Sequence, residues 1–188
     1  MPVDGPYRLF AQFIIANAKK DINGNKIASV PYIDITAGST KAYTPAAPLP
    51  SKLIASADGF DTNIFFAPSE DDPGTAPATY FRANDQNTIA IQINKNGAPV
   101  KDLQTYRGSA ARIAAFGPDL QFSSANSEPD VNNQQTGLVI FNLKFADPGT
   151  YRLFMQTQQN NQFSTFDYNV TAKAITNTKP NSNKEQIK

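Results

Sequence analysis

The sequence predicts an all-β protein built around an immunoglobulin-like antiparallel β-sandwich. Short segments of alternating apolar and polar residues recur along the chain, and clusters of Gly, Pro, Asn and Asp separate them. Only 18% of the residues are charged, while 40% are hydrophobic and 11% are aromatic. Because β-branched and aromatic residues favour strands, this composition favours a sheet protein over a helical one.

The first predicted element is a β-hairpin within residues 1–36. Apolar residues alternate from Tyr7 to Ile15, the turn DINGN follows, and a second strand covers residues 27–35. Asn23-Gly24 suits a tight turn because both residues tolerate positive φ angles. An isolated hairpin is marginally stable in water. We therefore expect it to dock on the main domain or to pair with another protein through its exposed strand edge.

A boundary follows the hairpin. Residues 37–50 are rich in proline and small residues and do not alternate, which predicts a semi-rigid linker. Residues 51–173 contain the sandwich, and residues 174–188 have almost no apolar content, which predicts a disordered tail. The predicted sandwich strands lie within residues 53–66, 79–81, 88–94, 111–116, 119–122, 138–145, 151–158 and 163–170.

Nearly the same eight-residue segment occurs at two places in the chain. GPYRLFAQ occupies residues 5–12, and GTYRLFMQ occupies residues 149–156. The second copy follows Asp-Pro and is typical of a tyrosine corner, in which a Tyr after a Gly turn bonds back to the backbone while its ring joins the core. Gly149 and Tyr151 are therefore predicted to be structural, and Tyr7 to do the same in the first copy. Residues 1–36 are interpreted as the last hairpin of a preceding β-sandwich.

Two residue types are absent from the sequence, Cys and His. Their absence excludes disulfides, thiolate catalysis, zinc–sulfur sites and every Ser-His-Asp arrangement. The formal net charge of +1 argues against nucleic acid as a partner, and the apolar runs are too short for a helix that crosses a membrane. We expect neither a cofactor nor an enzymatic activity. The first residues do not resemble a signal peptide, so any export signal is expected outside this chain.

Residues 53–173 resemble the C-terminal β-sandwich domain of bacterial exported proteins that are loosely labelled heavy-metal-associated. The matching motifs are GAPVKDL, YRG, the strand DLQF and GTYRLFMQ. The resemblance implies an extracytoplasmic location and a metal-handling or polar site built on histidines. The nearest residues at those histidine positions are Arg112, Ser124 and Asn126, which are poor transition-metal ligands. A degenerate site is therefore expected at these three residues.

Two acidic stretches are candidates for calcium. Glu70, Asp71 and Asp72 could collect the ion together with loop carbonyls. Residues 21–25 match the opening of an EF-hand loop, but Lys26 stands where that loop requires Gly, which favours a simple turn.

Two carbohydrate chemistries are also open. Glycoside hydrolysis needs two carboxylic acids at a defined separation in a cleft. The available acids are expected beside turns or on solvent-facing strand positions: Asp58, Asp61, Asp102, Asp119 and Asp167. Carbohydrate binding without catalysis would use aromatic rings, because the C–H faces of sugars stack on them, with amide partners. The candidate rings are Tyr32, Tyr43, Tyr80, Tyr106 and Phe122.

Two functions therefore follow from the sequence. The first is a non-catalytic extracytoplasmic module with a structural or protein-interaction role. The alternative is a ligand-binding module for a carbohydrate or a metal ion. A concave site lined by aromatic and convergent polar groups would favour the alternative, and smooth sandwich faces would favour the first.

Overall fold

The computed structural model describes residues 4–11, 13, 17, 19, 30–38, 49–66, 80–106, 108–118, 121–127 and 136–174. These residues form strands, turns and connecting loops, and no helical segment among them has the length and hydropathy of a membrane span. The chain divides into two compact units, Met1–Ala47 and Pro48–Lys188. The all-β prediction is confirmed.

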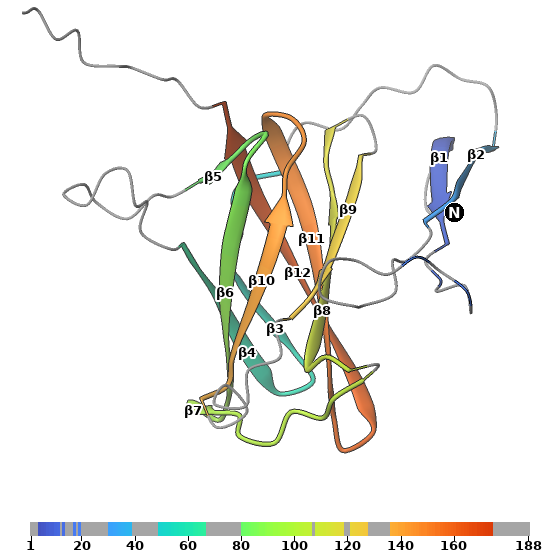
Figure 1. Cartoon of the computed structure of the whole chain (residues 1–188). Coiled ribbons are helices and arrows are strands. Elements are labelled where there is room, and N and C mark those ends of the chain that lie inside the picture. Colours follow the sequence, from blue (N-terminus) through green and yellow to red (C-terminus); the bar gives the residue numbers. More distant parts are fainter. Residues whose placement is uncertain are drawn as a thin grey trace, which may run out of the picture. The chain divides into compact units, whose positions relative to one another are not determined.

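The second unit is a sandwich of two five-stranded sheets (Figure 1). One sheet has the order β10-β6-β4-β3, with β7 paired to β6, and the other has the order β5-β12-β11-β8-β9. Neighbouring strands are antiparallel except β12 and β5, which are parallel. The strands are β3 (Ile54–Ala57), β4 (Phe60–Phe66), β5 (Phe81–Arg82), β6 (Gln86–Lys95), β7 (Ala98–Pro99), β8 (Ala111–Phe116), β9 (Phe122–Asn126), β10 (Leu138–Lys144), β11 (Gly149–Gln159) and β12 (Gln162–Lys173).

The core lies between the two sheets and follows the predicted alternation. Every second residue of a strand faces the opposite sheet, because the side-chain period of a strand is two. Each large apolar side chain buried in this way contributes about 1.5–3 kcal/mol. The inward positions predicted for four strands are confirmed as buried: Ile89, Ile91 and Ile93 of β6; Val139, Phe141 and Leu143 of β10 with the adjacent Phe145; Tyr151, Leu153 and Met155 of β11; and Phe166, Tyr168 and Val170 of β12.

One buried hydrogen-bonded pair joins the two sheets inside this core. The hydroxyl of Thr62 on β4 lies 2.6 Å from the hydroxyl of Tyr168 on β12, and it donates to the carbonyl of Ala55 at 2.8 Å. Since the Thr62 proton is used in that second bond, Tyr168 is the donor to Thr62. Burial raises the pKa of Tyr168 above its ordinary value.

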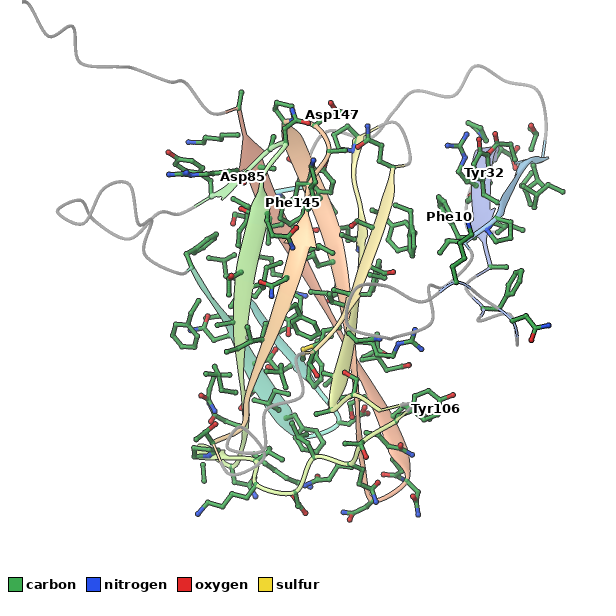
Figure 2. All side chains as sticks on the ribbon, in the orientation of Figure 1. Phe10, Tyr32, Asp85, Tyr106, Phe145 and Asp147 are labelled. Atoms are coloured by element: carbon green, nitrogen blue, oxygen red, sulfur yellow. The ribbon has the colours of Figure 1, made fainter. Side chains whose placement is uncertain are left out.

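The tyrosine corner predicted at Tyr151 is present. The Tyr151 hydroxyl donates to the carbonyl of Asp147 at 2.9 Å and accepts from the amide of Asp147 at 3.1 Å. Gly117 lies against the ring, since a Cβ there would stand 2.1 Å from Cε1 of Tyr151. Gly149 has a φ of +152°, and a Cβ there would stand 2.4 Å from Cγ of Pro118. Figure 2 places Asp147 at the end of the sandwich where this corner lies.

The first unit contains a two-stranded antiparallel hairpin, β1 (Gly5–Phe10) and β2 (Tyr32–Ala37). Its register repeats that of β11 and β12. Gly5 pairs with Ala37 and Tyr7 with Ile35, just as Gly149 pairs with Ala172 and Tyr151 with Val170. Gly5 has a φ of +147°, close to that of Gly149. The two octets therefore open strands of the same local geometry.

The arginine of each octet contacts one carboxylate and one aromatic ring. Arg8 donates to both carboxylate oxygens of Asp34, at 2.7 and 2.9 Å, and lies 4.1 Å from the ring centroid of Tyr32. Arg152 donates to Asp167 at 3.1 Å and lies 4.9 Å from the ring centroid of Phe154. In the register, however, Asp34 faces Arg8 whereas Asn169 faces Arg152. The likeness of the octets therefore holds for the backbone pairing and not for the partners of these two arginines.

One strand prediction was wrong in its bounds. The strand expected at residues 119–122 begins instead at Phe122 and runs to Asn126. Two backbone hydrogen bonds precede it: the Gly117 amide donates to the Gln121 carbonyl, and the Gln121 amide donates to the Pro118 carbonyl. In the first hairpin the described ladder runs to Phe10 and Tyr32, and beyond it the Ala11 amide donates to the Pro31 carbonyl at 3.0 Å. The predicted turn at residues 21–25, most of the linker and nearly all of the tail lie outside the described residues.

Candidate functional site

Three two-residue turns lie at the same end of the sandwich (Figure 1). They join β3 to β4, β6 to β7 and β11 to β12. All six central residues have positive φ angles, between 51° and 79°. This is the type I′ geometry, which matches the twist of antiparallel strands and favours Asn, Asp and Gly. The central pairs are Asp58-Gly59, Asn96-Gly97 and Asn160-Asn161.

A hollow of about 390 Å³ opens between two of these turns and the end of β6. We call it the tip pocket. Its volume lies in the range of about 300–1,000 Å³ that is typical of small-molecule sites. Its lining is mostly polar, with two aromatic rings. The residues that line it are Asp58, Phe60, Lys95, Gln159, Asn160, Gln162, Phe163 and Ser164.

The loop that follows β7 braces one wall of the tip pocket. The Gln159 side-chain amide donates to Asp102 at 2.5 Å and accepts from the Lys95 ammonium at 3.4 Å. Two residues further, in the β11–β12 turn, the Asn161 backbone amide donates to the Gln104 side-chain oxygen at 2.7 Å. Both the nitrogen and the oxygen of the Gln159 side-chain amide are therefore hydrogen-bonded, and this wall of the tip pocket is preorganised.

Three polar side chains of the pocket are left for other partners. Within the described part of the chain, no hydrogen bond of the protein engages the side chains of Asp58, Asn160 or Gln162, and all three are exposed. Together they offer one carboxylate and two amides, so they present acceptors and donors to the same space. A polar ligand could take up these bonds without breaking any within the described fold.

An exposed aromatic ring stands beside these groups. Phe163 is 44% exposed although it lies on a strand of the sandwich. Tyr106 contacts it edge to face, with ring centroids 4.9 Å apart and an interplanar angle of 81°. Figure 2 shows Tyr106 at this end of the molecule, next to the β11–β12 hairpin. The deeper ring, Phe60, is buried and carries the Lys95 ammonium at 4.7 Å from its centroid.

Arg112, Ser124 and Asn126, the residues at the expected degenerate site, come together on neighbouring strands. Arg112 pairs with Asn126 in the register of β8 and β9, and its Nε donates to the Asn126 side-chain oxygen at 3.0 Å. Ser124 lies two residues before Asn126 and therefore on the same, outward face of the sheet. The three residues form a polar row, but they are not part of the tip pocket.

The other acidic candidates that the structure describes do not come together as a metal site or as a pair of catalytic acids. Among the described residues, no three acidic side chains form a cluster that could hold a metal ion. Glu70, Asp71 and Asp72 lie outside the described residues, as do Asp21 and Asp119.

The remaining acids have separate partners. Asp61 accepts from Ser56 and Asp102 from Gln159. Asp167 accepts from Lys52 at 2.6 Å as well as from Arg152. Asp58 is thus the one carboxylate among the described lining of the tip pocket.

The three candidate aromatic rings described in the second unit do not form one platform. Tyr80 carries the Lys173 ammonium at 4.2 Å, Phe122 packs on Phe116, and only Tyr106 of the candidates in this unit lies beside the tip pocket. Tyr32 belongs to the first unit, and Tyr43 lies outside the described residues.

Sequence reasoning missed Phe60, Phe163 and the amides of the β11–β12 turn as site residues. The signal that could have found them is the recurrence of Asn, Asp and Gly pairs between strands. It predicts the turns, but their convergence depends on the strand order.

Comparisons with known proteins place the chain in a family. Residues 75–174, more than half of the chain, match a family described as a domain of unknown function (DUF8832). This segment contains the pocket residues from Lys95 to Ser164 and excludes Asp58 and Phe60. No curated protein matches the chain. A crystal structure of a DUF4426 family protein from Pseudomonas aeruginosa PAO1 is similar at 10% identity, with 63% of this chain and 94% of that chain covered and a TM-score of 0.43.

Proposed function

Because the chain belongs to the family described as a domain of unknown function (DUF8832), we propose its function from its own geometry. We propose that the sandwich is a non-catalytic module that binds a small polar ligand in the tip pocket. One observation carries this proposal. A hollow of about 390 Å³ brings Asp58, Asn160 and Gln162, whose side chains have no hydrogen-bond partner within the described residues, next to the exposed ring of Phe163.

The absence of catalysis in this proposal follows from the chemistry of the pocket. The sequence has no His and no Cys, which are the commonest general base and the commonest low-pKa nucleophile. A mechanism with two carboxylic acids needs a second acid at the site. In the described lining Asp58 has no such partner. Binding is then the role that the remaining amides and rings support.

The proposal also covers the setting of the module. The sandwich has a tyrosine corner at the start of its penultimate strand, as immunoglobulin-like domains do. The motifs that resemble exported heavy-metal-associated proteins favour an extracytoplasmic location. The polar row of Arg112, Ser124 and Asn126 stands where that resemblance would put histidines. For this chain we therefore favour an organic ligand over a transition metal.

The experiment that tests the proposal is a thermal-shift screen of small polar compounds on the full chain. A ligand that binds the folded state raises the midpoint of thermal unfolding. At a ligand concentration one hundred times Kd, it adds about 2.7 kcal/mol to the free energy of unfolding. The variant Gln162→Trp fills the pocket and should abolish the shift. Gln86→Trp is the matched control, since Gln86 is also exposed but starts β6 at the opposite end of that strand. Shifts that survive Gln162→Trp would contradict the proposal, and the control Gln86→Trp should keep the shift of the parent chain.

A second candidate function, protein interaction, is favoured by one observation on the first hairpin. Leu9 is 46% exposed and Ile33 is 61% exposed. Their counterparts in the repeated register, Leu153 and Tyr168, are fully buried. Apolar residues left open on a hairpin suit association with a second copy of the chain. Analytical ultracentrifugation over a wide concentration range tests this, and a single monomeric species throughout would contradict it.

A further inference from the structure

We infer that the ligand of the tip pocket is an uncharged saccharide whose ring stacks on Phe163. This inference rests on the proposed function and names the chemical class of its ligand. Three properties of the pocket support this inference: its charge balance, its unengaged hydrogen-bonding groups and its exposed ring. Each of them excludes other classes of small ligand.

The charges of the pocket balance. Asp58 and Lys95 are the charged residues in its lining. The Lys95 ammonium is already engaged by Gln159 and by the ring of Phe60. An anion such as phosphate would meet one engaged cation and a carboxylate that repels it, and a divalent cation would meet one carboxylate and an ammonium. Neither charged class is matched to this lining.

The unengaged polar groups suit hydroxyls. A sugar hydroxyl is both donor and acceptor, and it needs a partner of each kind. The Asp58 carboxylate accepts, while the side-chain amides of Asn160 and Gln162 both donate and accept. The main chain holds these side chains at the pocket, since Asp58 and Asn160 occupy positive-φ turn positions. A purely apolar ligand would leave them without partners at a cost of about 1–3 kcal/mol each.

The exposed ring supplies the apolar part of a sugar site. The face of an aromatic ring carries negative charge density, and it attracts the weakly positive C–H groups on one side of a pyranose. Tyr106 fixes the orientation of Phe163 through the edge-to-face contact described above. The ring is therefore a prepared surface at the rim of a polar hollow, which is the combination of stacking and hydrogen bonding that a saccharide requires.

The test is an NMR titration of the ¹⁵N-labelled full chain. The probes are three neutral disaccharides (maltose, cellobiose and N,N′-diacetylchitobiose), followed by tri-alanine and inorganic phosphate. At least one disaccharide should shift the backbone amides of Lys95 and of residues 159–164. The variant Phe163→Ala should weaken that binding by about tenfold.

Phe65→Ala is the matched control, because Phe65 is 47% exposed but lies on β4, outside the pocket lining. It should bind like the parent chain. Asp58→Asn keeps a side chain that tolerates the positive φ and removes the charge, so it should weaken binding and leave the spectrum of the fold unchanged.

The outcomes separate the saccharide from the pocket. Shifts of these amides with tri-alanine or phosphate, but with no disaccharide, would overturn the saccharide and leave the proposed function standing. No shift with any probe would count against both. Disaccharide shifts confined to residues far from the tip pocket, or binding that Phe163→Ala leaves unchanged, would overturn the inference.

Discussion

The buried bond between Thr62 and Tyr168 predicts an asymmetry between two nearly isosteric substitutions. Tyr168→Phe removes the donor, and the Thr62 hydroxyl keeps its bond to the Ala55 carbonyl. Thr62→Val removes the acceptor, so it leaves the Tyr168 hydroxyl buried with nothing to donate to, and it also removes the donor to the Ala55 carbonyl. Thr62 is 2% exposed and Tyr168 is 0% exposed, so water cannot take the place of the lost partner without rearrangement.

The magnitudes follow from this difference. Loss of one buried hydrogen bond between neutral groups costs about 0.5–1.5 kcal/mol, which is the cost expected for Tyr168→Phe. A buried donor left unsatisfied costs about 1–3 kcal/mol, which applies to Thr62→Val. In the double variant the Tyr168 hydroxyl that Thr62→Val orphans is gone. The stability loss of the double variant should therefore be smaller than the sum of the losses of the two single variants.

Urea denaturation of the four proteins measures these free energies. The pH dependence of the free energy of unfolding gives an independent check on the burial of the Tyr168 hydroxyl. Because burial raises the pKa of Tyr168 above 10.0, the folded state holds this proton more tightly than the unfolded state does. Its contribution to stability is fully present below pH 10.0 and falls as the pH rises further. Tyr168→Phe should lose this alkaline decline. Equal costs for the two single variants would refute the assignment of Tyr168 as donor, and an unchanged alkaline slope would count against the burial of its hydroxyl.

Two further predictions concern the outer layers of the sandwich. Gly117→Ala should lower stability by about 1–3 kcal/mol in the same assay, because the new methyl group meets the Tyr151 ring and the Tyr151 hydroxyl is tied to the backbone. Lys52 and, to a lesser extent, Arg152 lower the pKa of Asp167, so its stabilising effect is present above pH 3.8 and is lost as the pH falls through the lowered pKa. Asp167→Asn should therefore reduce the loss of stability in acid, and an unchanged acid limb would count against this ion pair.

The inward faces of the long strands could be predicted from the sequence because they depend on local alternation. Ile89, Phe141 and Leu153 occupy positions of period two, and a slip by one residue would bring polar neighbours into the core. The tyrosine corner was predictable for a similar reason, since its glycine, tyrosine and hydrogen bonds lie within a few residues of one another.

Features set by distant partners could not be predicted in this way. The start of β9 follows backbone hydrogen bonds that link Gly117, Pro118 and Gln121, and no alternation of apolar and polar residues marks it. The parallel pairing of β5 with β12 involves two residues of β5 and leaves almost no trace in the pattern. Phe163 reads as an ordinary strand residue, and only the register next to Gln158, together with Tyr106, shows it exposed beside a pocket.

The tip pocket also explains how a site can arise on a fold with few reactive residues. Type I′ turns require Asn, Asp or Gly because of backbone angles, so the ends of antiparallel strands gather amides and carboxylates for structural reasons alone. A polar turn is therefore weak evidence of function. The stronger evidence lies in what the turns do not require, namely the side chain of Gln162 without a bond in the described fold, the ring of Phe163 in solvent, and a brace on Gln159 that the turn geometry does not need. If the turns were merely structural, replacing Asn160 and Asn161 by glycines would leave stability nearly unchanged and have no other consequence. On the proposed function, that double variant should fold and lose ligand affinity.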